Sequence, residues 1–274
     1  MTGLLKSDFR RILKDKLLIV VGILAVVFAI TLPLLYAVIF STADMLATEM
    51  LGNMFTAKTL FFSSFSMGNN LGLVAPVLLA IILCKDFSFG TIRNKVIAGK
   101  SRSQIFLSLF ISCAVVLIVV MLLHAFIALG VSLIFFEYQQ TAFTLADFGY
   151  FLASLGFEIL DLLFVAALLS WLCANMKNVG LVIVLYIAIA MALVLAGSIL
   201  QTIISVLQLS PGNEKLLSVL EFFNRINIGS ASLYIGVGTS YSLKDVLYLV
   251  ISPVVGIGFF LGYGLLKFNK KDLK

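Results

Sequence analysis

Six long apolar runs, separated by short charged segments, most constrain what this chain can fold into. The first, Leu17–Phe40, contains no charged residue, and a helix needs only about 20 apolar residues to cross a hydrocarbon core of about 30 Å. Backbone polar groups in lipid must pair within their own segment, which favours helices for such runs. The sequence therefore predicts an all-α integral membrane protein. It forms a single domain over residues 1–274, with transmembrane helices at about 17–40, 60–84, 104–136, 150–173, 179–207 and 246–266.

The composition excludes an ordinary soluble domain. Hydrophobic residues make up 62% of the chain and charged residues 12%, against about 45–50% and about 25% in typical soluble domains. The three cysteines, Cys84, Cys113 and Cys173, have no disulfide or metal-ligand spacing. Residues 94–101 end like a phosphate-binding loop, but Asn94 stands where the first glycine should be. We therefore expect no enzyme activity, no ATPase site, no metal and no bound cofactor in this chain.

The distribution of Lys and Arg predicts the orientation. With the N-terminus inside, the basic residues on the outer side are Lys58, Lys215, Arg225 and Lys244. The rest of the 19 then lie in residues 1–16, in residues 85–103, at Lys177 and in the C-terminal tail. Because basic residues stay on the cytoplasmic side, this bias predicts a multi-pass membrane protein with both termini in the cytoplasm.

Residues 1–16 are amphipathic. Leu5, Phe9 and Ile12 share one helical face, and the other is crowded by Lys6, Arg10, Arg11 and Lys14. A helix of this kind lies in the headgroup region with its basic side toward anionic lipid. We therefore expect an interfacial elbow helix before the first span.

Residues 208–245, on the outer side, are too short and too polar to span the membrane twice. Apolar residues nevertheless recur there at helical spacing, namely Leu216, Leu217, Leu220 and Phe223. A stretch that is apolar on one face suits a re-entrant helical hairpin or an interfacial helix. The sequence favours a re-entrant hairpin before the last span.

Two acidic residues lie inside the fourth span. Glu158 and Asp161 are three positions apart and share one helical face. A carboxylate at mid-membrane costs at least about 2.5–3.5 kcal/mol on insertion scales, so both should face protein or a water-filled cavity. They either line a pathway or proton site, or form a structural pair with a group on another helix. Arg225 is a candidate partner, unless Glu221 holds it within one helix.

The charged segment 85–103 carries the most specific pattern in the chain. Its residues are, in order, Asp86-Phe87, Gly90-Thr91-Ile92-Arg93 and Ser101-Arg102. An acid, a Gly-Thr pair and a Ser-Arg pair that opens the third helix resemble the first cytosolic loop of ABC-type-two exporter permeases. The layout of an N-terminal elbow, six spans and a long outer segment before the last span is also similar to that family. Gly99-Lys100 departs from it, since many members have a proline there, and Asp86 stands where Glu is usual.

The resemblance implies a permease subunit that works with a second permease chain, as a homodimer or a heterodimer. It also implies separate ABC ATPase subunits, which hold ATP and Mg. Residues 91–98 would form a coupling helix that docks in a groove of the ATPase, with Gly90 at a turn or at a close backbone approach. Nucleotide-driven closure of the ATPase pair would then switch the bundles between inward-facing and outward-facing arrangements.

Within this arrangement, the resemblance implies a role for individual side chains. Thr91 and Ile92 would pack in the ATPase groove. Asp86 and Arg102, which flank the coupling helix, would anchor it by charge-assisted hydrogen bonds. The open alternative for this segment is a basic loop that holds anionic lipid through its charge alone.

The resemblance thus implies the membrane-spanning permease subunit of an ATP-driven exporter. Similar permeases often export a hydrophobic or antimicrobial peptide, and lipids, drugs and sodium ions are the alternative substrates that the sequence leaves open. The expected partners of the subunit are the ATPase, the second permease chain and the lipid bilayer, and no nucleic acid. The alternative function is a secondary transporter or channel that uses Glu158 and Asp161 as an ion or proton site.

Overall fold

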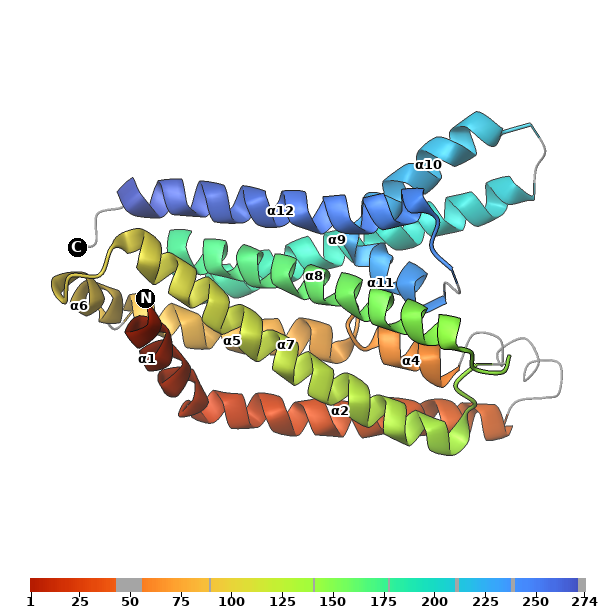
Figure 1. Ribbon diagram of the computed structural model, residues 1–274, viewed down its shortest axis with the longest axis horizontal. Coiled ribbons are helices and arrows are strands. Elements are labelled where there is room, and N and C mark those ends of the chain that lie inside the picture. The colour runs from red at the N-terminus through yellow and green to blue at the C-terminus, as the bar shows by residue number, and fades with distance from the viewer. Residues whose placement is uncertain are drawn as a thin grey trace.

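The computed structural model describes residues 1–42, 56–88, 90–139, 141–176, 178–209, 212–237 and 240–270. Within these residues the regular structure is α-helix, and the long helices lie side by side in an elongated bundle (Figure 1). Among the basic positions that predict the orientation, Lys177, Lys271 and Lys274 lie outside the described residues.

Six helices of the described part are long and apolar enough to cross a membrane, in agreement with the predicted number. They are α2 (Lys16–Thr42), α5 (Asn70–Ser88), α7 (Arg102–Phe135), α8 (Leu145–Asn175), α9 (Val179–Gln208) and α12 (Leu243–Lys270). The 34 residues of α7 extend about 51 Å at about 1.5 Å per residue. This helix exceeds the thickness of a hydrocarbon core, and Figure 1 shows it crossing the bundle at a slant.

The second apolar run is not one helix. The prediction of a continuous span at 60–84 is wrong, because α4 (Ala57–Ser63) ends in a turn and α5 begins at Asn70. Backbone hydrogen bonds of the i to i+3 type tighten the chain at this turn, donated by the N–H groups of Ser64, Phe65 and Ser66. Gly72 permits the turn to fold back, since a Cβ there would lie 2.0 Å from the carbonyl oxygen of Ser66. The span therefore shortens to the 19 residues of α5.

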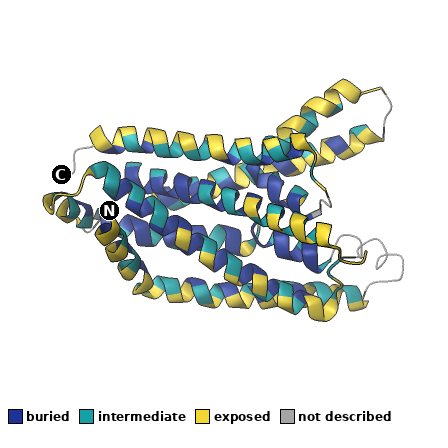
Figure 2. Cartoon of the chain, viewed as in Figure 1, coloured by how far each residue is buried: buried dark blue, intermediate teal, exposed yellow. Residues whose placement is uncertain are grey.

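Helix α8 lies at the centre of the packing, against α5, α7 and α12. Small residues let the helices approach closely, as is usual in membrane bundles. A Cβ at Gly256 of α12, for example, would lie 2.5 Å from the ring of Phe164 on α8. Cys84 and Cys173 meet between α5 and α8 as free thiols, with their sulfur atoms 3.1 Å apart. Figure 2 shows the buried residues gathered between these helices, while α10 and the end of α9 are mostly exposed.

Two buried polar side chains bind neighbouring helices together. The hydroxyl of Tyr186 on α9 donates to the carbonyl oxygen of Gly72 on α5 at 2.9 Å. Nδ1 of His124 on α7 lies 2.9 Å from the carbonyl oxygen of Ala25 on α2. A buried polar group without such a partner would cost free energy, so both side chains have a structural role.

The described parts of residues 208–245 include two helices, α10 (Glu214–Ile226) and α11 (Ile228–Val237), joined at Asn227. The side-chain amide of Asn227 donates to the carbonyl oxygen of Leu193 at 2.8 Å. Because Leu193 lies halfway along α9, the junction of the two helices lies at half the depth of the bundle.

One end of the bundle, called the α6 end below, holds both ends of the described chain. Helix α1 (Thr2–Leu13), the short helix α6 (Thr91–Ile97) and Lys270 lie there, and Figure 1 shows them together. An even number of spans requires this arrangement. The α6 end carries the segments that the charge bias assigns to the cytoplasm.

Candidate functional site

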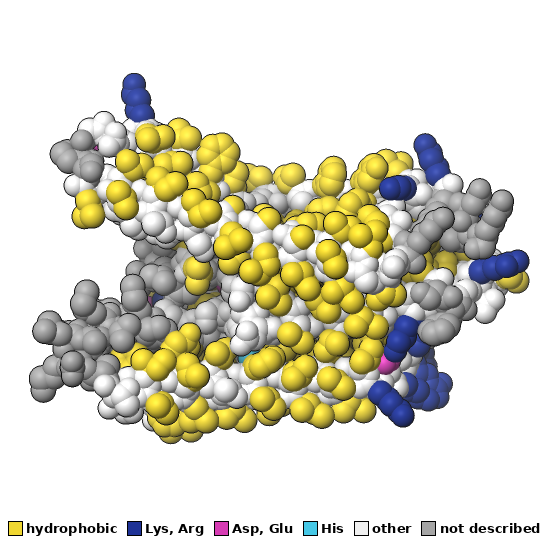
Figure 3. All heavy atoms as spheres, turned by 180° about the vertical axis from the view of Figure 1, so that it is seen from behind, with side chains coloured by type: hydrophobic (Ala, Val, Ile, Leu, Met, Phe, Trp, Pro, Cys, Tyr) yellow, Lys and Arg dark blue, Asp and Glu magenta, His cyan; other side chains and the backbone are white. Residues whose placement is uncertain are grey.

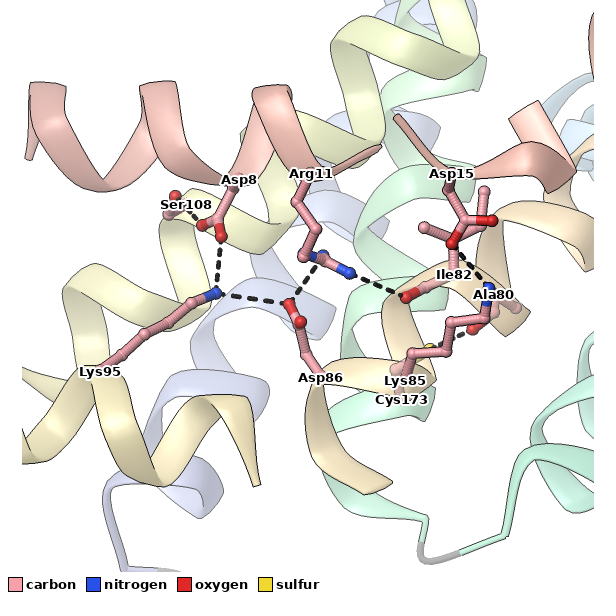
Figure 4. A network of polar contacts seen from close by, with 10 residues as sticks. All are labelled: Asp8, Arg11, Asp15, Ala80, Ile82, Lys85, Asp86, Lys95, Ser108 and Cys173. Atoms are coloured by element: carbon pink, nitrogen blue, oxygen red, sulfur yellow. Dashed lines mark hydrogen bonds and ion pairs between the residues drawn. The ribbon is translucent and has the colours of Figure 1, made fainter. Parts of the chain in front are cut away.

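A cluster of polar side chains joins helix α6 to three other helices (Figure 4). It consists of Asp8 and Arg11 on α1, Asp86 on α5, Lys95 on α6 and Ser108 on α7, and is called the α6 cluster below. Nζ of Lys95 donates to Asp8 Oδ1 at 2.6 Å and to Asp86 Oδ2 at 3.3 Å. The hydroxyl of Ser108 donates to Asp8 Oδ2 at 2.6 Å, and Arg11 Nη2 lies 2.7 Å from Asp86 Oδ2.

The two acids and Lys95 of the α6 cluster are almost closed to solvent, whereas the side chain of Arg11 is 29% exposed. The side chains of Asp8 and Asp86 are each 1% exposed, and that of Lys95 is 11% exposed. Two carboxylates thus face two cations, Lys95 and Arg11. Such pairs contribute little net stability, because each ion loses its hydration, but removing one partner leaves an uncompensated buried charge at a cost of about 3–5 kcal/mol. The cluster therefore resists any separation of α1, α5, α6 and α7.

A second ion pair lies beside the cluster. Asp15, in the turn between α1 and α2, accepts from Lys85 Nζ at 2.6 Å and from the backbone N–H of Leu17 at 3.0 Å. Burial alone would raise the pKa of Asp15, but these hydrogen bonds and the charges of Lys85 and Arg11 bring it below its ordinary value. The corner between α1 and α2 is thereby fastened to the end of α5.

Two glycines flank helix α6. The range of this helix agrees within one residue with the helix expected at 91–98. Gly90, at its N-terminus, has φ of 67°, and Gly99, after its C-terminus, has φ of 77°. These are left-handed conformations that glycine adopts without strain. A Cβ at Gly90 would meet nothing within 4 Å, so Gly90 serves the turn and not a close approach.

Helix α6 has one inward and one outward face. Ile92 is 2% exposed and packs in the chain's own core, which corrects the expectation that it fills a groove of the ATPase. Thr91 is half-buried. The outward face presents Arg93 and Asn94 together with Ile97, which is 75% exposed. Any partner that binds at α6 therefore contacts Arg93, Asn94 and Ile97.

The remaining predicted coupling residues hold the chain to itself. The ring of Phe87 meets that of Phe268 edge-on, with centroids 6.1 Å apart. Ser101 is the N-cap of α7, and its hydroxyl accepts from the N–H of Gln104 at 3.3 Å. The Ser-Arg pair in the sequence therefore marks the start of a helix.

Asp86 and Arg102 differ in what they anchor. Asp86 holds α6 directly through Lys95, in agreement with the prediction. Arg102 instead donates from Nη1 to the carbonyl oxygen of Asn269 at 2.7 Å. This contact ties the start of α7 to the end of α12, and an anchoring role of Arg102 for α6 stays a prediction.

Sequence reasoning missed Asp8 and Lys95 as members of the site. The buried stripe of α1 is Leu4, Asp8 and Ile12, and not the predicted Leu5, Phe9 and Ile12. A signal was present, because Asp8 is four positions from both Leu4 and Ile12 and so shares their face. An acid on a buried face requires a cation, and Lys95 lies in the neighbouring helix.

Glu158 and Asp161 lie inside the bundle on α8. Glu158 is 0% exposed and Asp161 is 8% exposed, so both face protein rather than lipid. Neither carboxylate oxygen of Glu158 has a hydrogen-bond partner among the described residues. A buried acid without a partner is costly unless it is held in its neutral form.

Arg225 is not the partner of these acids. It pairs with Asp245 at the start of α12, and its guanidinium lies over the ring of Tyr234 at 5.2 Å. The predicted pairing of Arg225 with Glu158 and Asp161, or with Glu221, is therefore wrong. The cause is tertiary, because α10 packs against α12 and brings Arg225 to an acid far along the sequence.

A family model described as a protein of unknown function, DUF2705, matches residues 19–274. The chain belongs to the DUF2705 family. No curated protein matches it. The matched range includes Asp86 and Lys95 of the α6 cluster, whereas Asp8 and Arg11 precede it. Because the description of the DUF2705 family assigns no activity, the function has to be argued from the geometry.

Proposed function

We propose that this member of the DUF2705 family is the membrane-spanning permease subunit of an ATP-driven exporter. In this proposal it pairs with a second permease chain and is driven by separate ATPase subunits in the bacterial cytoplasmic membrane. The observation that carries the proposal is the placement of α6. This helix is fastened to α1 and α5 by Lys95 and presents Arg93, Asn94 and Ile97 outward.

The surroundings of α6 favour a protein partner over lipid. Lys and Arg side chains gather at this end of the molecule (Figure 3), and such segments stay in the cytoplasm. Ile97, 75% exposed, would there stand in water rather than in hydrocarbon. A lipid-holding loop needs only charge, and it gives no reason for an exposed isoleucine on an ordered helix.

The α6 cluster supplies a mechanical connection. Lys95 holds Asp8 of α1 and Asp86 of α5, and Asp8 holds Ser108 of α7. A push on α6 would therefore displace three helices together, since separating the charges is costly. Rigid displacement of packed helices is the kind of motion that alternates a pathway between two openings.

The rest of the chain suits this role. Helix α1 would serve as the interfacial elbow, and α10 and α11 as the re-entrant hairpin whose junction lies at mid-membrane. The permease would export a hydrophobic or antimicrobial peptide, and the ATPase alone would bind ATP and Mg.

The test compares two exposed apolar residues at opposite ends of the molecule. Ile97→Ser and Arg93→Ala should each lower copurification of a co-expressed ATPase and its stimulated activity several-fold. Leu145→Ser is the matched control, because Leu145 is 88% exposed but lies at the end away from α6. Equal loss in the control, or no loss in either α6 variant, would refute the proposal.

Glu158 favours a second candidate function, a secondary transporter or channel with a proton site. Its two oxygens have no hydrogen-bond partner in the described part of the chain, as expected of a group that gains and loses a proton. Uptake or efflux by ATP-free proteoliposomes under an imposed pH gradient separates the two functions. Gradient-driven transport that Glu158→Gln and Asp161→Asn abolish would favour the second.

A further inference from the structure

A cavity with a volume of about 610 Å³ lies between α9, α10 and α11. We call it the α9–α10 groove, and its polar residues used below are Ser198, Gln201, Glu221, Asn224 and Ser230. Its volume falls within the range of about 300–1,000 Å³ that is usual for small-molecule sites. Figure 3 shows this face hollowed between the α9–α10 pair and the helices below it.

Three donors of the groove are already occupied within the protein. The hydroxyl of Ser198 donates to the carbonyl oxygen of Val194 at 3.0 Å, and that of Ser230 donates to the carbonyl oxygen of Asn224 at 2.6 Å. The amide nitrogen of Asn224 donates to Gln201 Oε1 at 2.9 Å. The hydroxyl protons and one amide proton are therefore already committed within the protein.

The acceptors of the same wall are not matched. Glu221 forms no ion pair with any described residue, because the nearby Arg225 is paired with Asp245. Asn224 Oδ1 is buried without a hydrogen-bond donor. The groove thus presents one unbalanced carboxylate and spare acceptor capacity, which is complementary to a ligand that carries a positive charge and N–H donors.

Apolar side chains line the rest of the same groove, namely Val194, Ile204 and Leu233. A second cavity of about 370 Å³ shares Ser66, Val194 and Leu233 with the first. It continues toward α2, α4 and α7, where its lining combines apolar and polar residues, among them Phe28, Leu60 and His124. The apolar path for a ligand tail therefore lies within the groove itself, along Val194, Ile204 and Leu233.

We propose that the α9–α10 groove binds a cationic amphiphile, with an ammonium group paired to Glu221 and a hydrocarbon tail along Val194, Ile204 and Leu233. As the substrate class of the exporter, this assignment rests on the proposed function. As a binding site, it is testable on the purified chain without any ATPase.

The experiment measures dissociation constants of dodecylamine, dodecanol and dodecyl phosphate for the chain in phosphatidylcholine–phosphatidylglycerol nanodiscs, corrected for binding to empty nanodiscs. Dodecylamine, protonated near neutral pH like a lysine amine, should bind at least about tenfold more tightly than the other two. Glu221→Gln should remove that preference. Glu214→Gln is the matched control, since Glu214 lies on the same helix but outside the groove, and it should change nothing.

A second variant tests the tail. Leu233→Trp, at a position that is 57% exposed, should fill the apolar part of the groove and weaken dodecylamine and dodecanol several-fold alike. Equal affinities for the three head groups, or an unchanged preference in Glu221→Gln, would overturn the proposal. Adding phosphatidylethanolamine identifies the source of the ammonium. Competition assigns the site to a bilayer lipid, and its absence assigns it to a free amphiphile; both outcomes support ammonium recognition.

These results are independent of the exporter proposal. If dodecylamine binds as expected while the α6 variants leave ATPase coupling intact, the site stands and the exporter proposal fails. If ATPase coupling behaves as expected but the head groups are not distinguished, the exporter stands with another substrate class.

Discussion

The α6 cluster and the α9–α10 groove differ in how their charges are balanced. In the cluster, Asp8 and Asp86 each meet a cation, and the charges of the two acids are balanced by Lys95 and Arg11. In the groove, the one available cation is taken by an acid of another helix, and Glu221 is left with none. A balanced cluster holds helices together, whereas an unbalanced one beside a cavity has capacity left for a ligand.

The surrounding helices differ in the same sense. In the most apolar 18-residue stretch of α7, 61% of the residues are buried, whereas in that of α9 only 17% are buried. Helix α10 has no buried residue. The part of the molecule that would transmit force in the proposed exporter is thus tightly packed, and the part that would receive a ligand has open faces on either side.

The largest expected effect would break the balanced side of this comparison. Lys95→Met leaves Asp8 and Asp86 buried without their shared cation and should lower the free energy of unfolding by about 3–5 kcal/mol. Denaturant unfolding of the purified chain in detergent measures this loss of stability. Lys100→Met, at an exposed position of the same segment, should change stability by less than about 0.5 kcal/mol. A loss below about 1 kcal/mol in Lys95→Met would show that the charges are solvated rather than interdependent.

A smaller loss is expected where the groove does have a pair. Asp245→Asn removes the partner of Arg225 and weakens the cap that Asp245 forms with Ser242, at a cost of about 1–3 kcal/mol. Glu221→Gln, one helical turn before Arg225, should lower the free energy of unfolding by less than about 0.5 kcal/mol because no ion pair is lost. Similar losses in both variants would mean that Glu221 is paired after all.

The orientation of α6 depends on Gly90. Gly90→Ala places a Cβ on a residue with φ of 67°, which costs about 1–2 kcal/mol for an L-residue. Gly3→Ala in α1, where a Cβ also meets nothing within 4 Å and φ is ordinary, should not destabilise the chain. Equal thermal unfolding midpoints for Gly90→Ala and Gly3→Ala would argue against a strained turn at Gly90.

The smallest effect concerns pH. The pKa of Asp15 lies below its ordinary value of 3.8, so its contribution is fully present above about that pH and is lost as pH falls through the folded-state pKa. The stability difference between the wild type and Asp15→Asn should therefore be constant near neutral pH and shrink below pH 3.8. Unfolding midpoints measured across this range check it. A difference that is independent of pH would assign Asp15 a role without charge.

The sequence by itself determined the fold class and the number of spans. Hydropathy and Lys/Arg bias are local properties, and lipid as a solvent leaves helices as the only way to satisfy the backbone of such runs. The short helix at residues 91–97 was expected from the resemblance to exporter permeases, and Gly90 before it has the left-handed conformation that glycine adopts without strain. The break at Ser64–Asn69 was not predicted, because Gly72 reveals its role only when the turn folds back onto it.

Only the tertiary structure decided which charges meet. Asp86 was recognised as an anchor, but its cations come from α1 and α6, and Asp8 reaches Ser108 a hundred positions away. Arg225 had three candidate acids, Glu158, Asp161 and Glu221, and pairs instead with Asp245. Ile92 was expected to contact a partner, but it packs in the chain's own core. Ion pairs and burial depend on how helices pack in three dimensions, and a periodic sequence pattern specifies the face of a helix but not the neighbour that covers it.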